Sequence, residues 1–588
     1  MNDNGTGSGG GIAAPAAILG VIFGGGALYL AGSLGGTLGV ALVGGGWAWP
    51  DTSVKSVFRL LGHGPGALWP GHATAATVGL VVLLVLVLAL LGVGAWYVWR
   101  RWFSHRPGLA GLREMAPLSP KAMTVKAREL RPSLEKLEAP ALPDDTGVLL
   151  GNLDQPHGPE LRASWEDVIL AIMAPRSGKS TALAIPAVQR APGAVLFTSN
   201  KIGEREVYNV TKAERARVGT VWTIDPQGIT HADRSLWWNM LAGARTIEGA
   251  GRLASHFIAA TTDEKSRGDF WMGAAKNLLT ALFHAAAVSD GSVADVLAWL
   301  STPSDRGPVN ALKAARKEAL AQQLASTVAG ASDTRDGIYE TARQCVACLL
   351  DPETLAWVTP DPRAKEFRPA DFVRTRDTLY LLSKDGGGSA AGVIAAAADA
   401  VLRAAMAAAE RAGGRLDAPL VAVLDEAANV CRIEDLPDLY SHLGSRGVVP
   451  MTILQSYRQG VRVWGEAGMD ALWSAATVKA LGSGLDDADF AEDVSRLVGD
   501  HKVHESSVSH GSTGRSVSTS RRRERVMEAA EIRALPKGRA LLLATGVRVG
   551  MIRLRPWYLE PGAAERTAAA KQETRRIAER ASRKVIEA

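Results

Sequence analysis

The stretch Ile169–Thr181, ILAIMAPRSGKST, decides the fold of this chain. An apolar run leads into a short turn, and the turn ends in Gly178-Lys179-Ser180. A strand followed by such a turn, with a helix beginning at the lysine, holds nucleotide phosphates through backbone N–H groups and the helix N-terminus. The residues from the turn into the helix are therefore candidate nucleotide-binding residues: Ala174, Pro175, Arg176, Ser177, Gly178, Lys179, Ser180 and Thr181.

Two side chains of this stretch have roles that follow from the chemistry of phosphate transfer. Lys179 is expected to reach the β- and γ-phosphates, and the Ser180 hydroxyl to complete the shell of a Mg²⁺ ion. In the pattern G-x-x-x-x-G-K-[ST], however, Met173 stands where the first glycine belongs. The pattern alone indicates a phosphate-binding loop of irregular form, which other parts of the chain must support.

The stretch LVAVLDE at Leu420–Glu426 supplies this support. Its apolar residues predict a buried strand, and Asp425 and Glu426 follow at the carboxyl end, the edge at which α/β sheets bind ligands. We expect Asp425 to hold the Mg²⁺, directly or through water, and Glu426 to orient and deprotonate the attacking water. Alone, this pattern also fits an ordinary strand end followed by a helix. Combined with the upstream loop, it favours a nucleotide site.

Two further polar residues flank the next predicted strand, which ends at Gln455. The amide of Gln455 is placed to sense the γ-phosphate or the attacking water. Arg446 lies in a turn just before the strand, and arginine stabilises charge on a transferring phosphoryl group, often from a neighbouring subunit. A surface salt bridge is the alternative interpretation of Arg446.

Apolar strands alternate with helical patterns over much of the chain, which predicts an α/β fold with a mostly parallel sheet covered on both faces. Between residues 246 and 368 an alanine- and leucine-rich helical pattern dominates. We therefore expect an all-helical domain at 246–368, inserted into a nucleotide-binding domain formed by 160–245 and 369–560. The predicted strands are Val168–Met173, Ala194–Thr198, Thr220–Ile224, Thr378–Leu382, Leu420–Leu424, Met451–Leu454, Val478–Leu481 and Ala540–Thr545.

The N-terminal region, residues 1–106, is predicted to be a membrane anchor. Its two long uncharged segments, about 12–43 and 73–99, each exceed the roughly 20 apolar residues that cross a bilayer. Basic residues gather directly after the second segment, which predicts a cytoplasmic C-terminal part. The first segment is rich in glycine, and spacings such as Gly35/Gly39 permit close helix–helix contact. Residues 107–159, rich in proline, leucine and charge, are expected to form a juxtamembrane connector.

The composition limits the number of domains, the kinds of partner and the use of disulfides. The 588 residues exceed one ordinary core and contain 66 lysines and arginines against 60 acidic residues, a net charge of +6. This mild excess permits contact with anionic polymers or lipid headgroups. Three cysteines exclude a disulfide framework.

In these motifs the chain resembles the VirD4/TraG family of type IV secretion coupling proteins. The most specific part is LDEAANVCRIEDLPDLYSHLGSRGVVPMTILQSYRQG, residues 424–460. Other matching stretches are APRSGKST, TIDPQG, DFWMGAAKNLLTALF and EIRALPKGRALLLATG. The chain departs from the family pattern at Met173, at Ala427, where an aromatic residue often follows the acidic pair, and at SNKIGE, residues 199–204.

The resemblance implies a hexameric RecA-like P-loop ATPase, anchored by two spans in the bacterial inner membrane, that uses ATP and Mg²⁺. Such a protein receives DNA, expected to be single-stranded, with its relaxase, or receives effector proteins, and passes them to a secretion channel. By position in the motifs, Lys179 and Ser180 take the phosphate and metal roles, and Asp425 and Glu426 the metal and water roles. Arg446 becomes the arginine acting on the neighbouring subunit, and Gln455 the sensor. The helical insertion becomes a cap on the cytoplasmic mouth.

Two basic segments lie outside these motifs. His501–Arg525 is rich in serine, glycine and histidine, and is expected to be a mobile loop. If it faces a central pore, its arginine cluster could track nucleic-acid phosphates without reading sequence; a surface loop without contacts is the alternative. Residues 561–588 form a basic tail, expected to be a solvated or partner-docking helix. The arginine cluster of the first segment, His501–Arg525, consists of Arg521, Arg522, Arg523 and Arg525.

Two other functions stay open from the sequence. An FtsK-like DNA translocase would account for the motor, but it leads us to expect a winged-helix domain after the motor, and few residues follow Glu560. A membrane recruitment receptor would bind nucleotide in the irregular loop with little turnover. DNA-stimulated ATP hydrolysis separates the second alternative from a coupling ATPase.

Overall fold

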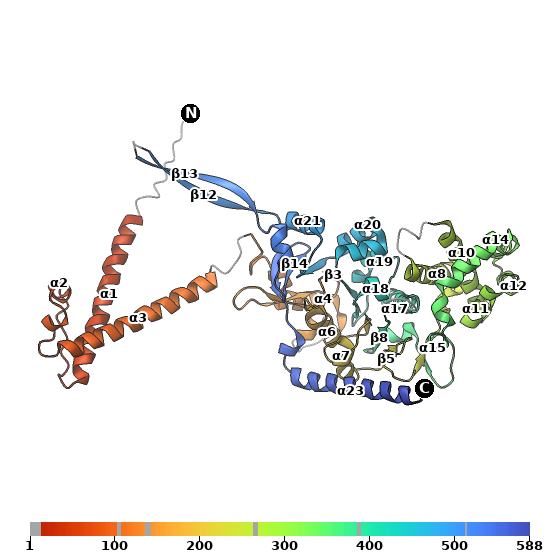
Figure 1. The fold of residues 1–588 in the computed structure, drawn as a ribbon, viewed down its shortest axis with the longest axis horizontal. Coiled ribbons are helices and arrows are strands. Elements are labelled where there is room, and N and C mark those ends of the chain that lie inside the picture. Colours follow the sequence, from red (N-terminus) through yellow and green to blue (C-terminus); the bar gives the residue numbers. More distant parts are fainter. Residues whose placement is uncertain are drawn as a thin grey trace. The chain divides into compact units, whose positions relative to one another are not determined.

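The computed structural model describes residues 13–102, 108–135, 143–262, 269–384, 390–511 and 514–587 (Figure 1). The chain divides into two compact units, Met1–His105 and Arg106–Ala588. This division falls next to the predicted end of the membrane anchor at residue 106.

Two long helices, α1 (Ala13–Leu42) and α3 (Ala73–Trp102), dominate the N-terminal unit, with the short α2 (Val54–His63) between them. They pack so closely that a Cβ added at Gly35 would collide with the backbone of Gly79. The glycines of the first segment therefore serve contact with α3 of the same chain.

Length and apolarity identify Ala73–Gly94 of α3 as a candidate membrane span, and almost none of this stretch is buried. In α1, the apolar stretch found among the described residues, Tyr29–Leu42, is shorter than a membrane span requires. The core helix α17 (Ala391–Arg411) is also long and apolar, but it is less apolar than Ala73–Gly94 and mostly buried, as expected of a helix inside a folded domain. Of the two predicted spans, the second meets both the length and the apolarity criteria within the described residues.

An eleven-stranded sheet forms the second unit, in the order β2-β1-β15-β14-β11-β3-β10-β9-β4-β8-β5. The strands from β11 to β5 in this order run parallel, and the other four attach antiparallel at one side. All eight predicted strands are present within a few residues of their expected bounds. The bounds are β1 Val148–Leu153, β2 Glu160–Ala163, β3 Ile169–Ile172, β4 Val195–Ser199, β5 Val221–Ile224, β8 Thr378–Leu382, β9 Leu420–Leu424, β10 Val448–Leu454, β11 Val478–Gly482, β14 Arg539–Ala544 and β15 Gly550–Arg553.

Three of these strands, β1, β2 and β15, were not predicted. β1 pairs with both β15 and β2, so the sheet extends into the segment 107–159 expected to be a connector. The helices α4 (Pro120–Leu130) and α5 (Pro132–Glu135) lie in the same segment.

Alternate residues of each central strand enter two separate cores, because successive side chains point to opposite faces of a sheet. In β3, Leu170 and Ile172 join the core on one face, and Ile169 and Ala171 the core on the other. Helices α17, α19 (Leu436–Leu443) and α20 (Tyr457–Ala475) contribute to the first core, and α6 (Ile185–Gln189) and α7 (Val207–Arg215) to the second. The predicted doubly covered α/β fold is confirmed.

Helices fill the predicted insertion at 246–368 (Figure 1). They follow β5 and precede β8, its neighbour in the sheet, so the insertion leaves the sheet and returns beside its point of departure. A short parallel pair, β6 (Leu236–Trp237) with β7 (Lys365–Glu366), joins the two ends. The helices are α8 Ile247–Thr261, α10 Phe270–Val288, α11 Val293–Ser301, α12 Gly307–Ala314, α13 Glu318–Ala329, α14 Ser332–Cys345 and α15 Pro352–Ala356.

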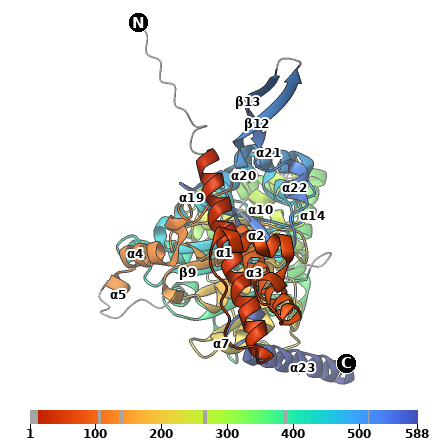
Figure 2. The ribbon, with the colours of Figure 1, turned by 90° about the vertical axis from the view of Figure 1, so that its left-hand side faces the viewer.

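The prediction of a loop at His501–Arg525 is wrong. This segment forms a long antiparallel hairpin of β12 (Asp500–Gly511) and β13 (Gly514–Arg525), which extends away from α21 (Ala488–Val498) in both views (Figures 1 and 2). A polar composition favours a disordered loop, but the backbone hydrogen bonds of an antiparallel pair form without a long apolar run.

The basic tail forms the helix α23 (Ala563–Glu587), which packs against α7 of the same domain. Lys212 of α7 forms a 2.7 Å ion pair with Glu573, and Asn209 donates a 2.9 Å hydrogen bond to Thr574. The inner face of the tail is thus occupied by its own domain. The remaining short helices are α16 Pro369–Phe372, α18 Ala427–Val430 and α22 Ala529–Arg533.

Candidate functional site

The turn after β3 has the conformation of a phosphate-binding loop. Gly178 takes a φ of 102° and Arg176 a φ of 61°, and the helix begins at Lys179 as predicted. The Oγ atom of Ser177 is buried and has no hydrogen-bond partner in the described structure. A phosphate oxygen would supply the missing partner.

The helix after the loop opens with a wide π turn, Ser180–Ala184, before α6 begins. Pro186 has no backbone N–H and crowds the carbonyl four residues earlier, which a wider turn relieves. The first helical turn, which carries Lys179 and Ser180, is therefore shaped by a residue outside the motif.

Met173 does not distort the loop. Its φ is not positive, its N–H donates to the Leu454 carbonyl at 3.0 Å, and its side chain is fully buried. The space for this side chain exists because residue 482 is glycine: a Cβ there would lie 2.6 Å from the Met173 Cγ. The missing glycine of the motif is thus compensated by a glycine in β11.

Glu426 is the centre of the site. Its Oε1 accepts a hydrogen bond of 2.5 Å from Lys179 Nζ and one of 3.2 Å from Lys201 Nζ. Its Oε2 accepts a bond of 2.5 Å from Gln455 Nε2 and a longer one of 3.3 Å from Asn429. Glu426 takes the left-handed conformation, φ 55° and ψ 37°, at the end of β9. Backbone strain of this kind is typical of functional sites, where the surrounding contacts hold it.

Asp425 faces the other side of the loop. Its Oδ2 accepts a 3.2 Å hydrogen bond from Ser180 Oγ, and its Oδ1 lies 3.7 Å from Lys179 Nζ. The two residues predicted to hold Mg²⁺ therefore present a hydroxyl and a carboxylate at adjacent positions, which are the oxygen ligands that this ion prefers.

Burial and charge separate the two carboxyls. Burial raises the pKa of Asp425, and Glu426 raises it further against the opposing Lys179. Burial also acts to raise the pKa of Glu426, but Lys179, Lys201 and Gln455 outweigh it and lower that pKa. Glu426 is therefore held ionised, the form in which a carboxylate can accept a proton from water.

Lys201 was not predicted as a site residue. It follows β4, which pairs with β9 in the sheet, and this pairing brings its ammonium to Glu426. Burial acts to lower the pKa of Lys201, but Glu426 outweighs it and raises that pKa. The signal in the sequence was the lysine of SNKIGE, noted only as a departure from the family pattern.

Gln455 follows β10, which lies between β3 and β9 in the sheet. Its side chain thus stands between the phosphate loop and the acidic pair, and its backbone N–H donates to Gln459 Oε1 at 3.0 Å. Gln459 donates in turn to Asn429, so a chain of amides fixes the orientation of Gln455.

Arg446 lies at the opposite edge of the sheet. It precedes β10, whose seven residues separate it by roughly 20 Å from Gln455. Its guanidinium lies 3.3 Å from Glu410 and is about one-third exposed. Arg446 therefore cannot reach the phosphate loop of its own chain, and the surface salt bridge considered as its alternative is present.

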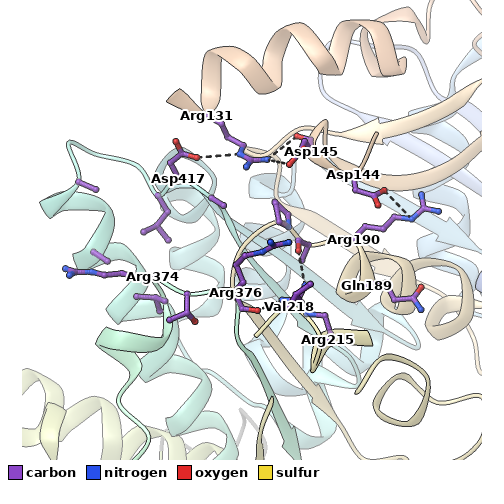
Figure 3. A pocket seen from close by; sticks show the side chains of 18 of the residues that line it. Arg131, Asp144, Asp145, Gln189, Arg190, Arg215, Val218, Arg374, Arg376 and Asp417 are labelled. Carbon is purple, nitrogen blue, oxygen red and sulfur yellow. Dashed lines mark hydrogen bonds and ion pairs between the residues drawn. The ribbon is translucent and has the colours of Figure 1, made fainter. Parts of the chain in front are cut away.

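A cavity of about 830 Å³ opens at this amino edge, where β4, β8 and β9 begin (Figure 3). Arg131 pairs there with Asp145 at 2.8 Å, and the buried Arg215 donates to the carbonyls of Ala191 and Gly193. Three exposed arginines of the lining have no acidic partner among the described residues. These are Arg374, Arg376 and Arg411.

The four arginines predicted to contact nucleic acid lie on β13 of the hairpin. Arg525 is held by Glu492 of α21 through two bonds of 2.6 and 2.7 Å, so its charge is already matched. Arg521, Arg522 and Arg523 are exposed.

A family model described as TraG-D_C, the TraM recognition site of TraD and TraG, matches residues 419–537. This region contains Asp425, Glu426, Arg446, Gln455 and the hairpin. No curated protein matches the chain.

Solved structures of the conjugative coupling protein TrwB share the fold. The unbound TrwBdeltaN70 is 19% identical, with a TM-score of 0.52, over 69% of this chain and 88% of that chain. TrwB with ADP and Mg²⁺ is 19% identical, with a TM-score of 0.50, over 66% and 85%. TrwB with a non-hydrolysable ATP analogue is also 19% identical, with a TM-score of 0.50, over 66% and 86%. The chain thus shares the fold of TrwB, and its residues 419–537 match the recognition region of TraD and TraG. Its RecA-like P-loop fold with a helical domain is the fold predicted from its motifs.

Proposed function

We propose that this chain is a coupling protein of the VirD4/TraG type: a membrane-anchored ATPase that recruits DNA with a bound relaxase, or effector proteins, and drives them into a type IV secretion channel. The observation that carries the proposal is the convergence of Lys179, Lys201 and Gln455 on Glu426. These residues come from loops after different strands, and they meet at the edge where α/β sheets bind ligands.

The residues present fit ATP and Mg²⁺. When bound, the ion would neutralise charge on the phosphates and would be held by Ser180 and Asp425. The buried hydroxyl of Ser177 and the helix N-terminus at Lys179 are suited to phosphate oxygens. Glu426, kept ionised by its neighbours, would accept the proton of the attacking water, and Gln455 would orient that water.

The distance of Arg446 from its own phosphate loop supports action on a neighbouring subunit. In a ring of like-oriented subunits, the amino edge of one sheet would face the carboxyl edge of the next. A homo-hexamer with Arg446 reaching across each boundary is the assembly that we propose, because Arg446 is too far from its own phosphate loop to act within one subunit.

The remaining partners are inferred from the apolar helix α3 and from the matched region 419–537. The exposed apolar α3 and the basic residues after it favour insertion in the bacterial inner membrane, contact with its lipid, and a cytoplasmic position for the sheet domain. The match to a recognition region of TraD and TraG supports docking of a DNA-processing complex near residues 419–537.

The test is ATP hydrolysis by the full-length protein in lipid nanodiscs, with and without DNA. Lys179→Ala is expected to abolish hydrolysis under both conditions. Lys313→Ala, which removes an exposed lysine from α12, is the matched control and should retain it. Unchanged DNA-stimulated hydrolysis in Lys179→Ala would overturn the proposal, and so would hydrolysis that DNA never stimulates.

A further inference from the structure

The pairing of β12 with β13 divides the charges of the hairpin between two faces. Lys502 lies opposite Arg523, and Val503 lies opposite Arg522. Directly opposed residues of an antiparallel pair share a face, and the face alternates at each step along a strand. The adjacent arginines Arg522 and Arg523 therefore belong to opposite faces.

One face of the described hairpin carries only basic charge beyond its base. Lys502 and Arg523 lie opposite each other there, and Arg521 lies two residues before Arg523 on the same strand, farther from the base of the hairpin. All three are exposed and have no acidic partner among the described residues. At the base of this face, Arg525 lies opposite Asp500 and is bound by Glu492, which neutralises it. We call the set Lys502, Arg521 and Arg523 the basic face.

The other face is mixed. Arg522 shares it with Glu524, which lies opposite His501, and with Val503. The run RRRER looks uniform in the sequence, but its residues alternate between the two faces. Arg521 and Arg523 lie on the face without acidic residues beyond the base, whereas Arg522 shares its face with Glu524. A charge that has no partner on its own protein is the one available to a polyanion.

The shape and composition of the hairpin favour duplex DNA. A two-stranded β-ribbon is one of the two elements that enter the major groove, and arginine forks match phosphate geometry. Unpaired bases are usually held by stacking on aromatic rings, whereas residues 500–525 contain no phenylalanine, tyrosine or tryptophan. The hairpin therefore has the charges for a phosphate backbone and lacks a platform for single-stranded bases.

We propose that the basic face binds the phosphate backbone of duplex DNA, without reading its sequence. This inference rests on the proposed function and specifies its partner: the hairpin holds a double-stranded region, whichever form passes through the channel. Arg522 and Arg525 take no part in the contact, although the sequence offers them on equal terms.

Two neighbouring arginines provide the test. Binding of full-length protein to labelled duplex DNA of mixed sequence is measured by fluorescence anisotropy over a series of salt concentrations. Each lost phosphate contact makes the slope of log affinity against log salt shallower by about 1. Arg523→Gln is expected to lower the slope by about this amount, and Lys502→Gln/Arg521→Gln/Arg523→Gln by about 3. Arg522→Gln, the same chemical change one residue away, should leave the slope unchanged.

Three results would overturn the inference. These are equal effects of Arg522→Gln and Arg523→Gln, a larger loss for single-stranded than for duplex DNA, and weakened binding to vesicles with anionic lipid while duplex binding is intact. Hydrolysis of ATP without DNA is measured on the same variants and should be unchanged. If the basic-face variants leave the salt slope of duplex binding unchanged while Lys179→Ala still abolishes hydrolysis, the proposed ATPase stands and only the hairpin inference is lost.

Discussion

The phosphate loop and the hairpin both present cations, but they do so in opposite ways. Lys179 is 5% exposed and forms an ion pair with Glu426. It needs this partner because a buried charge is tolerated only when an opposite charge matches it. Arg521 and Arg523 are exposed and need none. Chemistry in the loop therefore depends on the exact arrangement of a few side chains, whereas binding by the hairpin depends on the number of charges on one face and on salt.

The largest expected effect separates these two regions. Glu426→Gln removes the proton acceptor while keeping the size of the side chain, so hydrolysis should fall by about 10²–10⁴-fold with nucleotide binding retained. Duplex DNA affinity should stay at the wild-type value, because the hairpin shares no residue with the loop. Turnover, nucleotide binding and anisotropy on one preparation check all three.

Mixing tests whether this site is completed by a neighbour. Arg446→Ala subunits and Glu426→Gln subunits are each expected to be inactive as pure assemblies. In mixed rings, some boundaries pair an intact Glu426 with an intact Arg446, so hydrolysis should partly return. If no mixing ratio restores activity, Arg446 does not act across the boundary, and its ion pair with Glu410 is its whole role.

A smaller effect is expected from the packing that supports the loop. Gly482→Ala would place a methyl group 2.6 Å from the Met173 Cγ in a fully buried position. Overpacking of this kind lowers the free energy of unfolding by about 1–3 kcal/mol. Denaturant unfolding of the full-length protein checks the loss. Gly273→Ala in α10, where an added Cβ meets nothing within 4 Å, is the matched control and should lose no stability.

The double variant sharpens this prediction. Shortening Met173 in Met173→Ala/Gly482→Ala removes the clash, so it should recover part of the loss caused by Gly482→Ala. Additive losses in the double variant would mean that the two side chains are not coupled, and that the loop tolerates Met173 for another reason.

Met173 and Lys201 show where prediction from sequence succeeds and where it stops. The loop and the acidic pair are local patterns, so Lys179, Ser180, Asp425 and Glu426 were found and lie together. The partner of Met173 is Gly482, more than three hundred residues away, and Lys201 reaches Glu426 only because β4 lies beside β9. Neither relation is visible before the strand order is known.

The hairpin and the outer strands could not be predicted from the sequence, for a related reason. Apolar runs revealed the buried parallel strands, but β12 and β13 carry no such run. β1, β2 and β15 lie on the antiparallel side of the sheet, where weaker apolar patterning is expected. Which arginines share a face depends on the pairing register, and composition holds no information about it.

Lys201 combines the properties of both regions and should give the smallest effect. It is about half exposed, yet it contacts the buried Glu426 and helps to lower the pKa of that carboxyl. Glu426 must be ionised to accept a proton, so hydrolysis is lost as the pH falls through its pKa. Lys201→Gln should raise this pKa and move the acidic limb of the kcat profile to higher pH. The shift should be less than about one pH unit, because solvent screens an exposed charge. Lys201→Arg keeps the charge and should keep the limb in place. An equal shift in both variants would show that Lys201 acts by its shape, not by its charge.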